Sequence, residues 1–232
     1  YAAPDWRPNL KTAILPFEMR MGATVSREPR VELYGSLRIN YDTRSRGTTP
    51  LGPEIYFDNV VVPAFGIRAF PIKGVPWSVY AEIGGAYDLV FRQRSRWRLD
   101  FRAGTAYYRE WNTASRCPRG VTFPFRFVAD VYADANFFTR YDDNLIATAR
   151  VRPGVRLLET AYSNIDLYLH LSGSVDSNRE SFNNLIEIGP GLVFTPRTDL
   201  SIRFRVEGIY RMFIDGRRDW DPRLRVELFF RF

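Results

Sequence analysis

Apolar and polar side chains alternate along most of this chain. In segment 223–232 an apolar side chain stands at every second position, and arginines and a glutamate fall between them. A period of two is the side-chain period of a β-strand whose two faces meet different surroundings. The same alternation recurs in segments 31–41, 75–90, 97–111 and 165–175. The pattern therefore predicts an all-β chain.

Weaker alternation predicts the remaining strands. They are expected at 11–25 (bent at Pro16), 60–70, 125–137, 145–157, 184–194 and 200–210. The total is about eleven strands of roughly 10 to 14 residues, a length that crosses a bilayer at a tilt. Because bacterial single-chain barrels have even strand numbers, we expect about twelve strands, and ten to fourteen also fit. The missing strand would precede or lie within residues 1–10, or lie in 112–124; otherwise 11–25 is no strand.

Composition decides which surroundings the two faces meet. Charged residues make up 25% of the chain and the mean hydropathy is −0.27, yet 16% of the residues are aromatic. An arginine in the hydrocarbon midplane costs about 2 to 4 kcal/mol, so we expect the apolar face to meet lipid and the charged face to line a lumen. The sequence predicts a transmembrane, antiparallel, up-and-down β-barrel in the bacterial outer membrane, in contact with lipid and lipopolysaccharide.

A soluble sandwich or lipocalin-like barrel is the alternative, because its strands alternate equally well. Strand length, aromatic residues near strand ends and the terminal Phe232 favour the membrane barrel. Pro4 and Pro8 around Trp6 predict an irregular lead-in over residues 1–10, followed by a single barrel over 11–232. Tyr1 is not an initiator methionine, and we expect this chain to be a processed or trimmed piece of something longer.

The predicted lumen is rich in arginine. Only Lys11 and Lys73 are lysines, so 33 minus 2 leaves 31 arginines behind the net charge of +7. Nucleic-acid binders usually cluster basic charge on one helix face or in a lysine-rich run, and we predict no nucleic-acid partner. The predicted pore-lining residues are Arg38, Glu82, Arg98, Asp100, Arg102, Arg126, Asp130, Tyr132, Asp134, Tyr168, Arg203, Arg205, Glu207, Arg225 and Glu227.

Two interpretations of this lumen remain open. The charged side chains can form a ladder of cross-strand ion pairs that stiffens a closed barrel. They can also line a basic conduit for a sugar polymer, with inward tyrosines stacking on sugar rings. The tyrosines in question are Tyr34, Tyr80, Tyr108, Tyr132 and Tyr168.

Dispersed glycines and aromatics suggest a family. The motif residues are Gly66, Tyr80, Glu82, Asp100, Arg102, Gly104, Tyr107, Tyr108 and Trp111, followed by Asn183, Asn184, Gly189, Pro190 and Gly191. This set resembles the C-terminal barrel of the phage adsorption protein A family and, more distantly, exopolysaccharide export porins. The resemblance implies an export barrel that follows a periplasmic helical-repeat domain. No such repeats occur in this chain, so they would belong to a removed N-terminal domain or a partner.

An enzyme is the least favoured alternative. His170 and Ser172 form a His-x-Ser pair similar to the dyad of outer-membrane phospholipase and lipid A deacylase barrels. Those families place an Asn after the Ser, whereas Gly173 follows here, and their dyads face lipid, whereas the alternation turns His170 and Ser172 into the lumen. Cys117 is single and no metal-ligand cluster or nucleotide fingerprint occurs. We expect no catalytic residues, metal or cofactor.

The sequence thus predicts a non-enzymatic barrel that serves as a narrow pore or anchor for exopolysaccharide export. The alternative is a plugged structural barrel acting as an anchor or surface receptor through the predicted loops 45–59 and 213–222.

Overall fold

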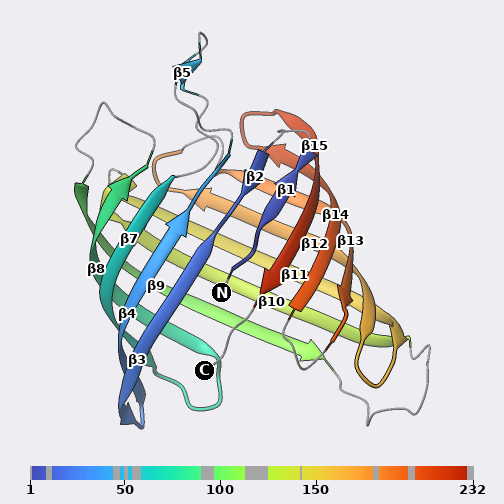
Figure 1. Cartoon of the computed structure of the whole chain (residues 1–232), viewed down its shortest axis with the longest axis horizontal. Coiled ribbons are helices and arrows are strands. Elements are labelled where there is room, and N and C mark those ends of the chain that lie inside the picture. Colours follow the sequence, from blue (N-terminus) through green and yellow to red (C-terminus); the bar gives the residue numbers. More distant parts are fainter. Residues whose placement is uncertain are drawn as a thin grey trace.

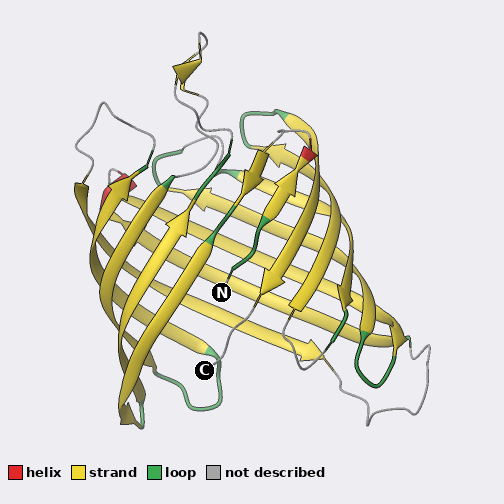
Figure 2. Ribbon diagram, viewed as in Figure 1, coloured by secondary structure: helices red, strands yellow, loops and turns green. Residues whose placement is uncertain are grey.

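The computed structural model describes residues 2–8, 12–43, 48–49, 52–53, 59–89, 97–112, 125–141, 143–179, 183–197 and 202–228. One antiparallel sheet of thirteen strands dominates it (Figure 2). The strands are β1 (Asp5–Arg7), β2 (Thr12–Ile14), β3 (Phe17–Arg27), β4 (Arg30–Asn40), β7 (Val60–Phe70), β8 (Trp77–Asp88), β9 (Trp97–Asn112), β10 (Arg126–Phe138), β11 (Asn144–Glu159), β12 (Asn164–Asp176), β13 (Leu185–Thr195), β14 (Ile202–Phe213) and β15 (Arg218–Leu228). A two-stranded hairpin, β5 (Thr48–Thr49) and β6 (Gly52–Pro53), and a 3₁₀ turn, η2 (Thr139–Tyr141), lie in connections.

Each long strand pairs with its neighbours in chain order, so the topology is up and down (Figure 1). Every strand predicted from the alternation has a counterpart in the sheet, and the predicted bend at Pro16 is the break between β2 and β3. The described residues contain no helix long and apolar enough to cross a membrane. The all-β, antiparallel prediction is confirmed.

The sheet curls so that its amino-terminal and carboxyl-terminal strands come together at β1. On one side Asp5 pairs with Arg225 of β15, and on the other it pairs with Ile14 of β2. Ala2 bridges both Leu228 and Phe17. Since β2 and β3 are one strand interrupted at Leu15 and Pro16, the thirteen strands of the described sheet occupy the expected twelve positions around the barrel.

Short strand β1 corrects the prediction of an irregular lead-in. Its three residues alternate between buried Asp5 and Arg7 and half-exposed Trp6, as the long strands do. Pro4 does not prevent pairing, because its carbonyl accepts a hydrogen bond from Val226 N–H (2.9 Å) while its missing N–H is not needed there. The strand absent from the sequence-based count therefore lies within residues 1–10.

The connection between β14 and β15 is also shorter than predicted. The alternation continues to Phe213 and resumes at Arg218, which leaves a four-residue turn at 214–217 instead of a loop over 213–222. Gly216 takes a positive φ of 87° in this turn. Arg217 N–H donates to the Asp215 carboxylate (3.1 Å), and this hydrogen bond lowers the pKa of Asp215. The terminal Phe232 and residues 113–124 lie outside the described residues.

The wall separates two kinds of side chain. In β9, Leu99 is 69% exposed on the outside while Asp100 next to it is 1% exposed on the inside. The outer face carries apolar and aromatic residues, including the neighbouring pairs Tyr87 with Trp97 and Tyr210 with Trp220. The interior is mainly charged, with a small apolar cluster of Val60, Val62 and Ala86. The barrel is thus inside out relative to a soluble protein.

Candidate functional site: the charged lumen

The described fold turns the predicted pore-lining residues inward. Seven of them are at most 9% exposed, namely Arg38, Glu82, Asp100, Tyr168, Arg205, Glu207 and Glu227. The remaining members of the set are partly exposed on the same inner face. The alternation therefore assigned the faces, but it did not identify the partners of each charge.

The eight partly exposed members are Arg98, Arg102, Arg126, Asp130, Tyr132, Asp134, Arg203 and Arg225.

Glu82 is the centre of one buried cluster. Tyr34 on β4 reaches across Gly66 on β7 and donates its hydroxyl proton to Glu82 Oε1 on β8 (2.7 Å). Arg38 forms an ion pair with the same carboxylate, and its second nitrogen lies 3.5 Å from Asp100 on β9. A Cβ on Gly66 would lie 2.8 Å from Tyr34 Cζ. Glycine is therefore needed for the tyrosine to reach its acceptor two strands away.

Glu207 repeats this arrangement on another part of the wall. Tyr168 on β12 crosses Gly191 on β13 and donates to Glu207 Oε1 on β14 (2.7 Å). A Cβ on Gly191 would lie 2.4 Å from Tyr168 Cζ. His170 Nδ1 lies 3.1 Å from Glu207 Oε1, and Arg152 Nε lies 3.9 Å from it. We call the two clusters the Glu82 site and the Glu207 site.

A third tyrosine follows the same rule with an amide in place of the carboxylate. Tyr80 on β8 crosses Gly104 on β9, and its hydroxyl donates to Asn136 Oδ1 on β10 (2.5 Å). Sequence reasoning identified the tyrosines and several of the glycines, but it did not identify the contact that each tyrosine makes across a glycine with an acceptor two strands away. The partners are 39 to 56 residues apart in other strands, so only the register between strands brings them together.

The three tyrosine–acceptor pairs are separated by 48, 39 and 56 residues along the chain, in the order given above. No local sequence motif of the kind that spans a few residues could have indicated these pairs.

The faces of two of these tyrosines are covered by guanidinium groups. Arg20 and Arg68 lie over the Tyr34 ring, with their guanidinium carbons 5.3 and 5.6 Å from its centroid. Arg152 and Arg205 lie over the Tyr168 ring at 5.6 and 5.4 Å. Cation–π contacts of this kind occupy the surface that a sugar ring would need for stacking. The geometry therefore gives these tyrosines a structural role in the lumen.

Ion pairs tie together strands that are not neighbours. Arg203 on β14 lies 3.0 Å from Glu110 on β9, five steps away in the strand order β9-β10-β11-β12-β13-β14. Arg223 on β15 pairs with Glu187 on β13. The Arg203–Glu110 pair therefore reaches across the lumen, whereas the Arg223–Glu187 pair crosses only β14 on the wall. The Arg203–Glu110 pair crosses the path that an open conduit would require.

Other predicted residues have closer partners. Arg102 packs on the Phe138 ring, with its guanidinium carbon 4.3 Å from the centroid. The remaining contacts of the predicted set are Arg126 with Glu159, Asp130 with Arg150, Tyr132 with Asp134, Arg205 with Glu227 and Arg225 with Asp5. Among the described residues, no ion pair or side-chain hydrogen bond joins Arg98 to another member of the set. Most of the set thus has a charged, polar or aromatic partner on the inner face.

Asp221 is the most enclosed acid that the prediction missed. Its side chain is 0% exposed, and one oxygen lies 3.1 Å from Arg7, 2.7 Å from Arg223 and 3.5 Å from Arg211. The prediction placed residue 221 in a loop, so its inward position in β15 was not recognised. Continuing the alternation back from Arg223 would have identified it.

His170 and Ser172 are joined by a third group. Ser172 Oγ lies 3.0 Å from His170 Nε2, and Glu207 lies at the other ring nitrogen, as in a nucleophile, base and orienting acid. However, Ser172 Oγ also lies 3.0 Å from Glu187 Oε2 and donates its only proton to this carboxylate. That proton is then not directed at His170 Nε2, as a nucleophile and base pair requires. The hydrogen bonds favour a structural link between Glu207 and Glu187.

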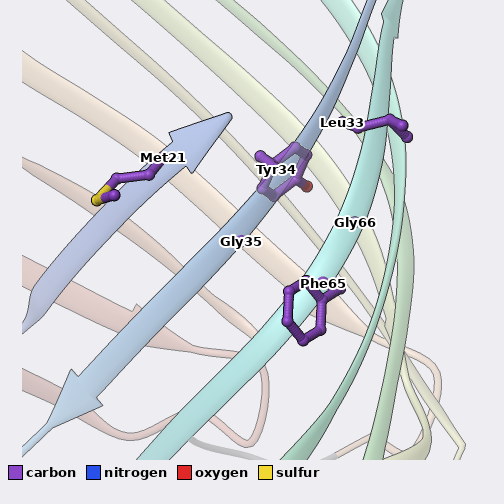
Figure 3. A pocket seen from close by; sticks show the side chains of 6 residues that line it. All are labelled: Met21, Leu33, Tyr34, Gly35, Phe65 and Gly66. Atoms are coloured by element: carbon purple, nitrogen blue, oxygen red, sulfur yellow. The ribbon is translucent and has the colours of Figure 1, made fainter. Parts of the chain in front are cut away.

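An apolar hollow of about 360 Å³ opens beside the wall near β3 (Figure 3). Met21, Leu33 and Phe65 contribute side chains to it, and Gly35 and Gly66 leave room between them. This lining suits hydrocarbon and lacks the charged groups that fill the lumen.

In the described ranges, no group of three or more His, Cys, Asp or Glu side chains is arranged to hold a metal ion.

Comparison of the chain with protein-family models, with curated proteins and with solved structures finds no match.

Proposed function

We propose that this chain is an outer-membrane β-barrel whose lumen is closed by its own side chains, and that it acts as a membrane anchor or surface receptor. The apolar outer face and the charged inner face support the membrane location. In water this arrangement would expose most of the large apolar side chains while burying the charges, which is unfavourable on both counts.

The observation that carries the closed lumen is the engagement of its tyrosines and charges with one another. Tyr34 and Tyr168 each donate to a buried glutamate and lie under two arginines. A lumen built in this way stiffens the barrel and leaves the surface connections to meet partners. It is the plugged-barrel hypothesis that the sequence left open.

Export of an exopolysaccharide is the second candidate. The pair of Arg203 and Glu110 favours it, because these side chains keep 25% and 31% of their surface exposed and can be separated at lower cost than the buried pairs. The resemblance to export barrels supports the same candidate. In this case the barrel would form a narrow pore that opens when the pairs across the lumen part.

Single-channel conductance in a planar bilayer tests both candidates. We expect no steady conductance from inserted protein, and we expect none after neutral or anionic oligosaccharides are added. A steady conductance that sugar blocks would overturn the closed lumen and support the export pore. Arg203→Ala is the matched variant, since a current that appears only in this variant locates the closure at the Arg203–Glu110 pair.

A further inference from the structure

Within the described residues, one edge of the barrel wall is unpaired over most of a strand. Strand β3 pairs with β4 along its length, and the only described residue that meets its other edge is Ala2, at Phe17. Within the described residues, nothing pairs with that edge from Met19 to Arg27. Figure 1 shows the lower part of β3 diverging from β15. Met21 is 70% exposed and Val25 is 58% exposed.

This edge lies in the apolar part of the wall. Met19 and Met21 point outward on the same face as Leu33 on β4, as the register of the two strands requires. Val25 is exposed and lies at the register shift between Thr24 and Ser26. If the barrel lies in a membrane, as proposed above, the free N–H and C=O groups of β3 would face hydrocarbon. Unpaired strand edges do not occur there, because no water is present to satisfy the backbone. Another strand must therefore cover this edge.

The register of β1 indicates how that strand runs. Arg7 pairs with Thr12, Asp5 with Ile14 and Ala2 with Phe17, so the paired residue numbers always sum to 19. The break at Leu15 and Pro16 leaves this register unchanged. Both β15 and β3 are antiparallel to β1, so a strand between them must run in the direction of β1.

We propose that the free edge of β3 receives an extended segment that continues β1 in the amino-terminal direction. With the same register, the first residue ahead of Tyr1 lies opposite Met19, the second opposite Arg20 and the third opposite Met21. The first and third would be apolar and face outward. The second would face the lumen, where an acidic or polar side chain fits beside Arg20, whose side chain is 29% exposed.

A second copy of the chain is a poorer occupant. Two barrels inserted in the same orientation are related by an axis along the membrane normal, so their β3 strands would run in the same direction. The free edge of β3 requires a strand that runs in the opposite direction, because Ala2 already pairs antiparallel with Phe17 at its start. A strand from an unrelated partner would have the right direction only if its amino-terminal end lay beside Arg27 and its carboxyl-terminal end lay beside Ala2.

Disulfide crosslinking tests the proposal. A nine-residue extension of alternating polar and apolar residues is fused ahead of Tyr1 in a Cys117→Ala background, with cysteine at the third position ahead of Tyr1, the seventh residue of the extension. Met21→Cys is introduced as the expected partner, and Val25→Cys, four residues farther along the same edge and out of register, is the matched control. We expect an intrachain disulfide with Met21→Cys and about tenfold less with Val25→Cys, because only close Cβ atoms can form the bond.

Crosslinking is measured in detergent micelles and in vesicles, and flotation with the vesicles reports insertion separately. Loss of flotation with the Met21 crosslink intact would contradict the membrane location and leave the strand addition standing. Equal crosslinking of both cysteines, or none, in folded protein would overturn the proposal. A disulfide between the Met21→Cys residues of two chains would instead identify a second copy as the occupant.

Discussion

The Glu82 and Glu207 sites have the same architecture in different surroundings. Each consists of a tyrosine, a glycine and a glutamate in register on three successive strands of the sheet. At the Glu82 site one covering arginine, Arg20, comes from the free-edged strand β3 and keeps 29% of its side-chain surface exposed. At the Glu207 site the covering Arg152 is 2% exposed, and His170 adds a further contact.

This difference shows how solvent exposure changes the contribution of the same contacts to stability. A charge pair that water can reach is screened and replaceable, whereas a buried pair leaves an uncompensated charge when one partner is removed. We therefore expect matched substitutions to be more harmful at the Glu207 site. The following predictions test that ranking, from the largest expected effect to the smallest.

Removal of the central charge should have the largest effect. Glu207→Gln leaves Arg152 and His170 facing a neutral amide, and we expect a loss of about 3 to 5 kcal/mol in the free energy of unfolding. Glu82→Gln should cost less, because Arg20 keeps Glu18 as a partner (2.7 Å) and Arg38 keeps Asp100. Urea unfolding in vesicles, followed by tryptophan fluorescence, measures both. An equal loss at the two sites would contradict the role of enclosure.

Removal of the tyrosine hydroxyl should have an intermediate effect. Tyr168→Phe keeps the ring over Gly191 but takes a hydrogen bond from the buried carboxylate, which we expect to cost about 1.5 to 3 kcal/mol. Tyr34→Phe should lie at the lower end of this range. The same unfolding assay compares them. If Tyr168→Phe were neutral, the tyrosine would contribute by packing alone.

Filling the glycine positions should have a smaller effect. Gly191→Ala and Gly66→Ala place a methyl group against a tyrosine ring, and overpacking of this kind costs about 1 to 3 kcal/mol. Gly173→Ala is the control, because the nearest atom to its added Cβ would be Leu185 O at 4.0 Å. We expect the control to change stability by no more than about 0.5 kcal/mol. Equal effects at Gly191 and Gly173 would contradict the argument that the tyrosine ring needs a glycine in order to reach its acceptor.

Much of the wall could be predicted from the sequence. The outward position of Leu99 and the inward position of Asp100 follow from period-two alternation, since successive side chains of a strand point to opposite faces. Two strand segments were missed because turn-forming residues beside them suggested irregular structure. The prolines before Lys11 suggested an irregular lead-in that hid β1, and the Asp–Gly turn at 215–216 was extended into a loop that hid the start of β15.

The site itself could be predicted only in part. The charge of Glu207 and its inward direction followed from its strand, but its contacts with Tyr168 and His170 depend on two interstrand registers. A shift of one residue in either register would turn one partner to the other face. The pattern along one strand carries no information about that register.

The sequence alone therefore determined the long strands, the two faces of the wall and the sign of each inward charge, because these depend on residue type and a local period. The tertiary structure decided which tyrosine crosses which glycine, which charges meet across the lumen and which strand edge remains open. Those features depend on how strands far apart in the chain are aligned when the sheet curls round to bring β1 between β15 and β2.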